Sequence, residues 1–171
     1  YIGFIILLIF ICCSITVGAQ NFLGLQHNLY KWFQIDNPFY LQDYDLKLHS
    51  RSLLSNYYKR NDFRMVWVSS DGITDMGNQF IKLLENSYEE GLFPEEYHLP
   101  TIKSISLKLN TEPQKYKSER WRDLIVVDLL LTDAFFLYTS DYIYGRLDAD
   151  THKRVWVKED KNIDYFKLLN K

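Results

Sequence analysis

The chain has 171 residues, with 20 Lys and Arg against 22 Asp and Glu, so its formal net charge is −2. This balance, without any basic block, excludes the electrostatic footprint expected of a nucleic-acid-binding protein. An apolar fraction of 47% is typical of one globular domain. The aromatic fraction is 16%, and we expect most rings in the core and in a half-buried shell. The alternative is a partner or glycan surface lined with Tyr and Trp.

The first 19 residues have the pattern of a secretory signal peptide. Residues 1–17 carry no charge, and they lead into the small residues of Val17-Gly18-Ala19. An apolar run before such a site predicts cleavage after Ala19 and export to the periplasm or cell envelope. The first residue is Tyr1 and not Met, so we expect the basic start of the signal to precede it. The alternative is an uncleaved membrane anchor, although a span needs about 20 apolar residues.

Both cysteines, Cys12 and Cys13, lie inside this apolar run. Cleavage after Ala19 would leave a mature chain without a disulfide, a thiolate metal ligand or a cysteine nucleophile. An exported domain of this kind must be held together by its core alone. That fits a bacterial envelope protein better than a small disulfide-rich secreted scaffold.

The part of the chain before residue 73 predicts mixed local structure. Residues 20–44 have aromatic side chains but no clear period, and we expect a lead-in with one short helix. A helix is predicted over 45–60, with Asp45 as its cap. Residues 64–69 are rich in β-branched and aromatic side chains, which predicts a short extended segment. A turn follows at Ser70-Asp71-Gly72.

The next helix is predicted from Thr74 or Asp75 to about Glu90. Either of the first two residues can cap it, and Gly91 stands where a C′ glycine belongs. Proline suits the first turn of a helix, and acidic residues are favourable there. Two short helices are therefore predicted, one beginning at Pro94 and one over 100–109, followed by a polar loop over 110–117.

The most informative stretch is a long helix over residues 118–144 that ends at Gly145 and would be roughly 40 Å long. Its apolar side chains lie on more than one face, which is typical of a helix that is buried or spans a membrane. Asp128 and Asp133 favour burial within protein, because each aspartate would cost roughly 2.5–3.5 kcal/mol at a bilayer centre. The sequence therefore predicts a mainly α fold, a soluble helical bundle around one long central helix.

The remaining residues complete the predicted organisation. An extended segment is expected over 146–157, and a helical pattern begins at Lys161 and runs to the end of the chain. The predicted parts are a signal peptide over 1–19, a lead-in over 20–44, one domain over 45–157 and a truncated following segment over 158–171.

The chain lacks a recognisable catalytic or metal-binding motif. No P-loop, dinucleotide-binding fingerprint or G-x-S-x-G elbow is present. No two histidines fall at ligand spacing, so a zinc site has little support. We therefore assign no catalytic, cofactor-binding or metal residue, and expect no cofactor. The histidines are His27, His49, His98 and His152.

Two acidic pairs, Glu89-Glu90 and Glu95-Glu96, are the other candidates for chemistry. A glycosidase uses two carboxylates that flank the scissile bond. Adjacent residues on a helix point in different directions, however. The simpler interpretation is a solvated helix end for Glu89-Glu90 and a helix start for Glu95-Glu96.

Asp128 and Asp133 lie inside the long apolar helix, and buried carboxylates need partners. Asp128 and Thr132 are four residues apart, and Arg146 follows the helix end. The favoured interpretation is structural: these groups hold neighbouring backbone amides or helix ends. Loss of the Asp128 carboxylate should then destabilise the fold, because its partners would be left unpaired.

Three blocks of sequence together resemble a known family. The first runs from Tyr57-Tyr58 to Trp67. The second, Glu89 to Leu99, is close to a GL-x-P-x-x-Y pattern, and the third comprises Asp128 to Phe135 and then Tyr144 to Asp148. In order and spacing they resemble the N-terminal scaffold domain of the large murein L,D-transpeptidases of Gram-negative bacteria, over about residues 45–157.

The resemblance implies a part in peptidoglycan cross-linking. Enzymes of that family form 3→3 peptide cross-links with a catalytic domain that carries a Ser-His-Gly-Cys-type motif and a cysteine nucleophile. This chain contains no such motif, so no catalytic residue is carried over. The resemblance predicts a non-catalytic scaffold part, with the catalytic domain as its partner in the same protein. Peptidoglycan is a further possible partner.

Two other functions stay open at this point. One is a stand-alone envelope module that binds peptidoglycan or a protein partner through exposed Tyr and Trp. The other is a hydrolase of an unrecognised type.

Overall fold

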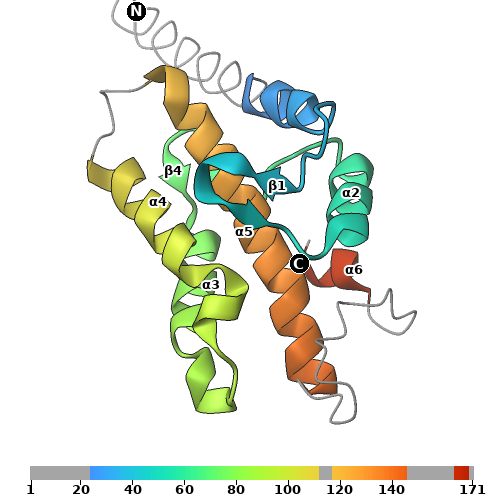
Figure 1. The fold of residues 1–171 in the computed structure, drawn as a ribbon, viewed down its shortest axis with the longest axis vertical. Coiled ribbons are helices and arrows are strands. Elements are labelled where there is room, and N and C mark those ends of the chain that lie inside the picture. Colours follow the sequence, from blue (N-terminus) through green and yellow to red (C-terminus); the bar gives the residue numbers. More distant parts are fainter. Residues whose placement is uncertain (1–23, 112–116, 146–163, 170–171) are drawn as a thin grey trace, which may run out of the picture.

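The computed structural model describes residues 24–111, 117–145 and 164–169 (Figure 1). The predicted signal peptide and the extended segment predicted over 146–157 lie outside the described residues. Most of the described residues are helical, so the mainly α class is confirmed. None of the helices in these ranges combines the length and the apolar character that a membrane span requires.

The lead-in contains more structure than the sequence predicted. Residues 24–32 are helical, as expected, but a small hairpin follows. Strands β1 (Tyr40–Leu41) and β2 (Leu46–Lys47) pair antiparallel and are joined by the 3-10 helix η1 (Gln42–Tyr44). Asp45 stands in this connection with a left-handed φ of 46°.

Helix α2 (Arg51–Arg60) begins six residues later than the sequence predicted. The prediction of a helix from Asp45 was wrong because Leu46 and Lys47 pair with β1 instead of entering the helix. The end of the prediction was right, since Asn61 is the C-cap.

The short extended segment predicted near 64–69 is confirmed in part as strand β3 (Val68–Ser69), which pairs with β4 (Gly72–Ile73) across the predicted turn. Helix α3 (Asp75–Glu85) follows, and the Thr74 hydroxyl caps it by accepting a hydrogen bond from the Gly77 N–H. The helix ends at Glu85 and not at Glu90. The chain turns at Asn86 into the 3-10 helix η2 (Ser87–Glu90), and Gly91 follows it with a φ of 75°.

The remaining elements match the sequence predictions closely. The 3-10 helix η3 (Pro94–Tyr97) has its proline in the first turn, and α4 (Leu99–Thr111) follows directly. The long helix α5 (Lys117–Tyr144) ends at Gly145, which has a φ of 77°. A short helix, α6 (Tyr165–Leu169), is the last described element.

Helix α5 runs the length of the molecule, with α3 and α4 on one side and α2 and α6 on the other (Figure 1). Every residue from Asp123 to Ala134 is buried, which is more than three helical turns. This burial explains why its apolar residues occupy all faces. Elements η3, α4, α2, β3 and α3 pack against it. The finer prediction, a bundle around one helix, stays a prediction, since short 3-10 and strand segments supply much of this packing.

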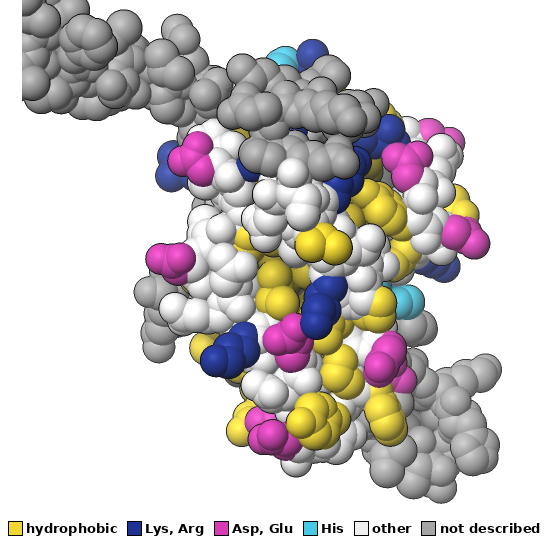
Figure 2. All heavy atoms as spheres, turned by 90° about the vertical axis from the view of Figure 1, so that its left-hand side faces the viewer, with side chains coloured by type: hydrophobic (Ala, Val, Ile, Leu, Met, Phe, Trp, Pro, Cys, Tyr) yellow, Lys and Arg dark blue, Asp and Glu magenta, His cyan; other side chains and the backbone are white. Residues whose placement is uncertain are grey.

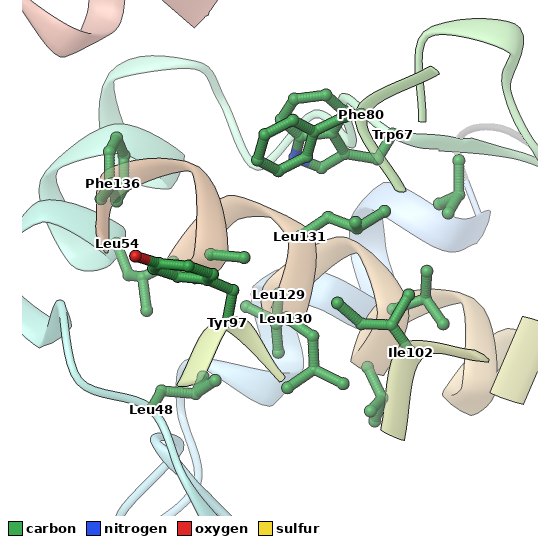
Figure 3. Close-up of a cluster of buried hydrophobic side chains, with 14 of the residues drawn as sticks. Leu48, Leu54, Trp67, Phe80, Tyr97, Ile102, Leu129, Leu130, Leu131 and Phe136 are labelled. Carbon is green, nitrogen blue, oxygen red and sulfur yellow. The ribbon is translucent and has the colours of Figure 1, made fainter. Parts of the chain in front are cut away.

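The core around α5 is rich in rings, as the composition predicted. Tyr57, Tyr58, Tyr97 and Phe136 are fully buried. Trp67 stacks on Phe80 with ring centroids 5.0 Å apart. Figure 3 shows three successive leucines of α5 among side chains from α2, η3, α4 and the segment before β3. They are Leu129, Leu130 and Leu131.

Candidate functional site

Two carboxylates of α5, Asp128 and Asp133, are the most unusual polar groups of the described residues. Both side chains have no exposed surface. They are five positions apart, so they leave the helix in directions roughly 140° apart. Each carboxylate therefore meets a different part of the surrounding chain.

Asp128 holds the segment that connects α2 to β3. Its Oδ1 accepts hydrogen bonds from the backbone N–H groups of Val66 (2.9 Å) and Trp67 (2.8 Å). Its Oδ2 accepts from the Tyr58 hydroxyl at 2.7 Å. Thr132, one turn later, donates to the Asp128 carbonyl and accepts from the Trp67 indole N–H at 3.0 Å. The carboxylate and its neighbours thus form a closed network of hydrogen bonds.

Burial in this network changes the acidity of its members. Removal from water raises the pKa of Asp128 to about 6, although the donors on Tyr58, Trp67 and Val66 act in the opposite direction. Burial and the neighbouring Asp128 charge raise the pKa of Tyr58 well above its usual value. Tyr58 therefore keeps its proton at neutral pH and can donate it to Asp128.

Asp133 caps the start of α2 from outside that helix. Its Oδ1 accepts from the Ser50 N–H at 2.7 Å, and its Oδ2 accepts from the His49 N–H at 2.9 Å. A carboxylate at a helix N-terminus accepts hydrogen bonds from backbone N–H groups that have no partner within the helix. Its negative charge also interacts favourably with the positive end of the helix dipole. This contact explains why α2 begins at Arg51.

The third partner of Asp133 is His98, which links η3 to α4. Its Nε2 lies 2.8 Å from Oδ2 of Asp133, and the ring is buried. The His98 backbone has a left-handed φ of 61°, which is uncommon for a residue with a Cβ. Burial alone would raise the pKa of Asp133, but His98 and the N–H groups of His49 and Ser50 lower it below its usual value.

The structure brings together two histidines that the sequence keeps 49 positions apart. The rings of His49 and His98 stack with centroids 5.5 Å apart and planes 8° from parallel. Within the described ranges, no group of three or more His, Cys, Asp or Glu side chains is arranged to hold a metal ion. The stacked pair lies beside Asp133, which His98 contacts directly.

A serine, two histidines and an aspartate in one place raise the question of nucleophilic catalysis. That chemistry requires the hydroxyl to lie within hydrogen-bond reach of the imidazole. The Ser50 hydroxyl is buried and has no hydrogen-bond partner among the described residues. Asp133 binds Ser50 only through its backbone N–H. The group therefore has the geometry of a helix cap and lacks that of a catalytic triad.

The other candidates from the sequence lie away from these two networks. His27 is exposed and lines a surface depression with Gln26, Tyr30, Asp62 and Phe63. Glu89, Glu90 and Glu95 are exposed, and Glu95 and Glu96 occupy the first turn of η3, as expected. His152 and Arg146 fall outside the described residues.

The sequence identified both aspartates and predicted that they hold backbone N–H groups of neighbouring elements, and these hydrogen bonds are present. It did not identify Tyr58, Trp67 or His98 as their partners. These residues lie between 35 and 70 positions away along the chain. No local period or spacing could have indicated the pairs.

The described residues form a mainly helical fold in which two buried carboxylates hold backbone from other elements. A family model described as the Scaffold domain matches residues 52–171. The match covers well over half of the chain, and the chain belongs to the Scaffold domain family. No curated protein and no solved structure matches it.

Proposed function

We propose that the chain is the non-catalytic scaffold part of a murein L,D-transpeptidase, which acts in peptidoglycan cross-linking and cell-wall biogenesis. The family match supports a scaffold role. The link to the transpeptidases is carried by the three blocks of sequence that resemble their scaffold domain. The export pattern of the first 19 residues adds a location in the periplasm or cell envelope.

One observation carries this proposal furthest: the three blocks meet in space. Tyr58 and Trp67 of the first block bind Asp128 of the third. His98 of the second block binds Asp133 of the third. Blocks that are far apart in sequence but are joined to one helix by buried hydrogen bonds are what a shared structural framework requires. This supports a resemblance that extends over the whole domain and is not limited to three short motifs.

The geometry also suits the work of a scaffold. Asp128 and Asp133 hold the segment before β3, the start of α2 and the start of α4 against a single helix. Hydrogen bonds to charged groups contribute about 1.5–3 kcal/mol each, and their loss in a buried site costs more. Such a framework would present a catalytic domain of the same protein in a fixed orientation.

The test uses the complete natural reading frame that contains this chain. Purified with peptidoglycan, the full protein should form 3→3 cross-linked muropeptides, detectable by mass spectrometry. Residues 20–171 alone should form none. A complete protein that lacks a cysteine-containing transpeptidase domain, or that forms no such cross-links, would contradict the proposal.

A second candidate function is a stand-alone envelope module that binds peptidoglycan or a protein partner. The exposed rings of Tyr88 and Tyr142 favour it. Among the described residues tryptophan contributes less than expected, since Trp67 is buried and Trp32 and Trp121 are half-buried. Cosedimentation of residues 20–171 with isolated cell-wall sacculi, lost on Tyr142→Ser, would favour this candidate.

A further inference from the structure

The last turn of α5 exposes apolar side chains on several sides. Tyr142, Ile143 and Tyr144 have exposed fractions of 61%, 51% and 50%. Successive residues of a helix point about 100° apart, so these three side chains do not share one face. This end of α5 therefore differs from the turns between Asp123 and Ala134, where every side chain is buried.

Two neighbouring segments extend the apolar surface. Tyr88 in η2 and Phe93 before η3 are exposed by 62% and 53%. The segments are held to α5 by two hydrogen bonds, from the Tyr138 hydroxyl to Glu90 (2.5 Å) and from the Tyr97 hydroxyl to Asp141 (2.9 Å). Residues 87–97 and 138–145 are thus held together, and we call their exposed side chains the acidic tip.

All the charged side chains of the acidic tip are acidic. Its two segments contain Glu89, Glu90, Glu95, Glu96 and Asp141, and neither contains a Lys or Arg. The whole chain is nearly neutral by comparison. Figure 2 shows acidic and hydrophobic side chains side by side at the lower end of the face that α3 and α4 form.

We propose that the acidic tip is a docking surface for a partner protein that presents a basic peptide segment with apolar side chains. Tyrosine and other rigid rings supply contact area at a low cost in conformational entropy. Acidic side chains around them favour a positive partner and repel a negative one. The same repulsion disfavours nucleic acid, an anionic membrane and a second copy of this surface. This docking proposal does not depend on the proposed link to transpeptidation.

The test measures peptide binding by the intact chain. The probe is a fluorescein-labelled peptide of lysine, leucine and serine, and its counterpart has glutamate in place of lysine. Anisotropy should report binding of the lysine peptide, weakening with added salt, and little binding of the glutamate peptide. The double variant Glu89→Lys/Glu95→Lys should weaken binding at least about tenfold. Tyr142→Ser/Ile143→Ser should weaken it to a similar extent.

Matched controls change the same kinds of side chain elsewhere. Asp36→Lys reverses an exposed charge outside the tip, and Leu107→Ser removes an apolar side chain that is 65% exposed on α4. Both should bind the lysine peptide as the native chain does. Equal loss in the controls, or equal binding of both peptides, would overturn the proposal. It would also be overturned if sedimentation shows a dimer that Tyr142→Ser dissociates, or if chitooligosaccharides bind the tip and the lysine peptide does not.

Discussion

The carboxylate of Asp133 lies 2.7 Å from the backbone N–H of Ser50 and serves as the cap of α2. Ser50 occupies the N-cap position of that helix, but its own side chain makes no capping hydrogen bond. A residue 83 positions further along the chain supplies the cap instead. The cap thus ties the start of α2 to the position of α5.

The first prediction concerns this cap. Asp133→Ala should lower the free energy of unfolding by about 3–5 kcal/mol, because two backbone N–H groups and the buried His98 ring would lose their partner. Urea denaturation followed by circular dichroism measures the change. Asp36→Ala, which removes an exposed carboxylate, should change stability by less than about 0.5 kcal/mol. Equal stabilities of the two variants would show that the cap contributes nothing.

The second prediction concerns the network around Asp128. Asp128→Ala should destabilise the fold by about 3 kcal/mol, since Val66 N–H and Trp67 N–H would be left unpaired and the Tyr58 hydroxyl would lose one of its partners. Thr132→Val should have a smaller effect, about 1–2 kcal/mol, because it mainly removes the acceptor of the Trp67 indole. Thermal unfolding of both variants ranks them. An unchanged melting temperature for Asp128→Ala would contradict the structural role.

The third prediction is a dependence of stability on pH. The pKa of Asp128 rises from 3.8 to about 6 on folding, so the folded protein binds this proton more tightly than the unfolded chain. Its contribution to stability is complete below pH 3.8 and is lost as the pH rises through about 6. At about 1.4 kcal/mol per pKa unit, the loss amounts to about 3 kcal/mol.

Comparison with Asp128→Asn isolates this effect. Asp133 acts in the opposite sense, because folding lowers its pKa. Its contribution to stability is complete at pH values above the usual pKa of an aspartate, and it is lost as the pH falls. Both proteins contain Asp133, so its contribution cancels in the difference. The unfolding free energy of the native chain minus that of the variant should fall between about pH 4 and pH 7. A difference that stays constant or rises with pH would disprove the assignment.

The fourth prediction concerns the contact between α3 and the segment before β3. A Cβ at Gly77 would lie 2.7 Å from the backbone oxygen of Trp67 and 2.7 Å from the Ile73 side chain. Gly77→Ala should therefore cost about 1–3 kcal/mol through overpacking, even though alanine is the better helix former. Gly24→Ala is the control, because a Cβ at Gly24 meets nothing within 4 Å. The denaturation midpoints of the two variants test this prediction. Similar midpoints would contradict the close contact of Gly77 with Trp67 and Ile73.

Most helices could be predicted from the sequence because their signals are local. Apolar residues on all faces of α5, Gly145 after its end and Thr74 before α3 each act within a few residues of the feature that they determine. Helix period, caps and left-handed glycines require no knowledge of the rest of the chain. The two buried aspartates could also be recognised, since a carboxylate in an apolar helix needs partners.

Only the tertiary structure decided which partners these are and where α2 begins. The hydrogen bonds of Asp128 and Asp133 reach residues 35 to 84 positions away, and no periodic pattern encodes such pairs. The helix predicted from Asp45 failed for the same reason, because pairing with β1 and the distant Asp133 cap outweigh the local helical pattern. The sequence determined a buried helix with two carboxylates. Packing then decided what they hold, because hydrogen bonds between distant segments form only when the core brings those segments together.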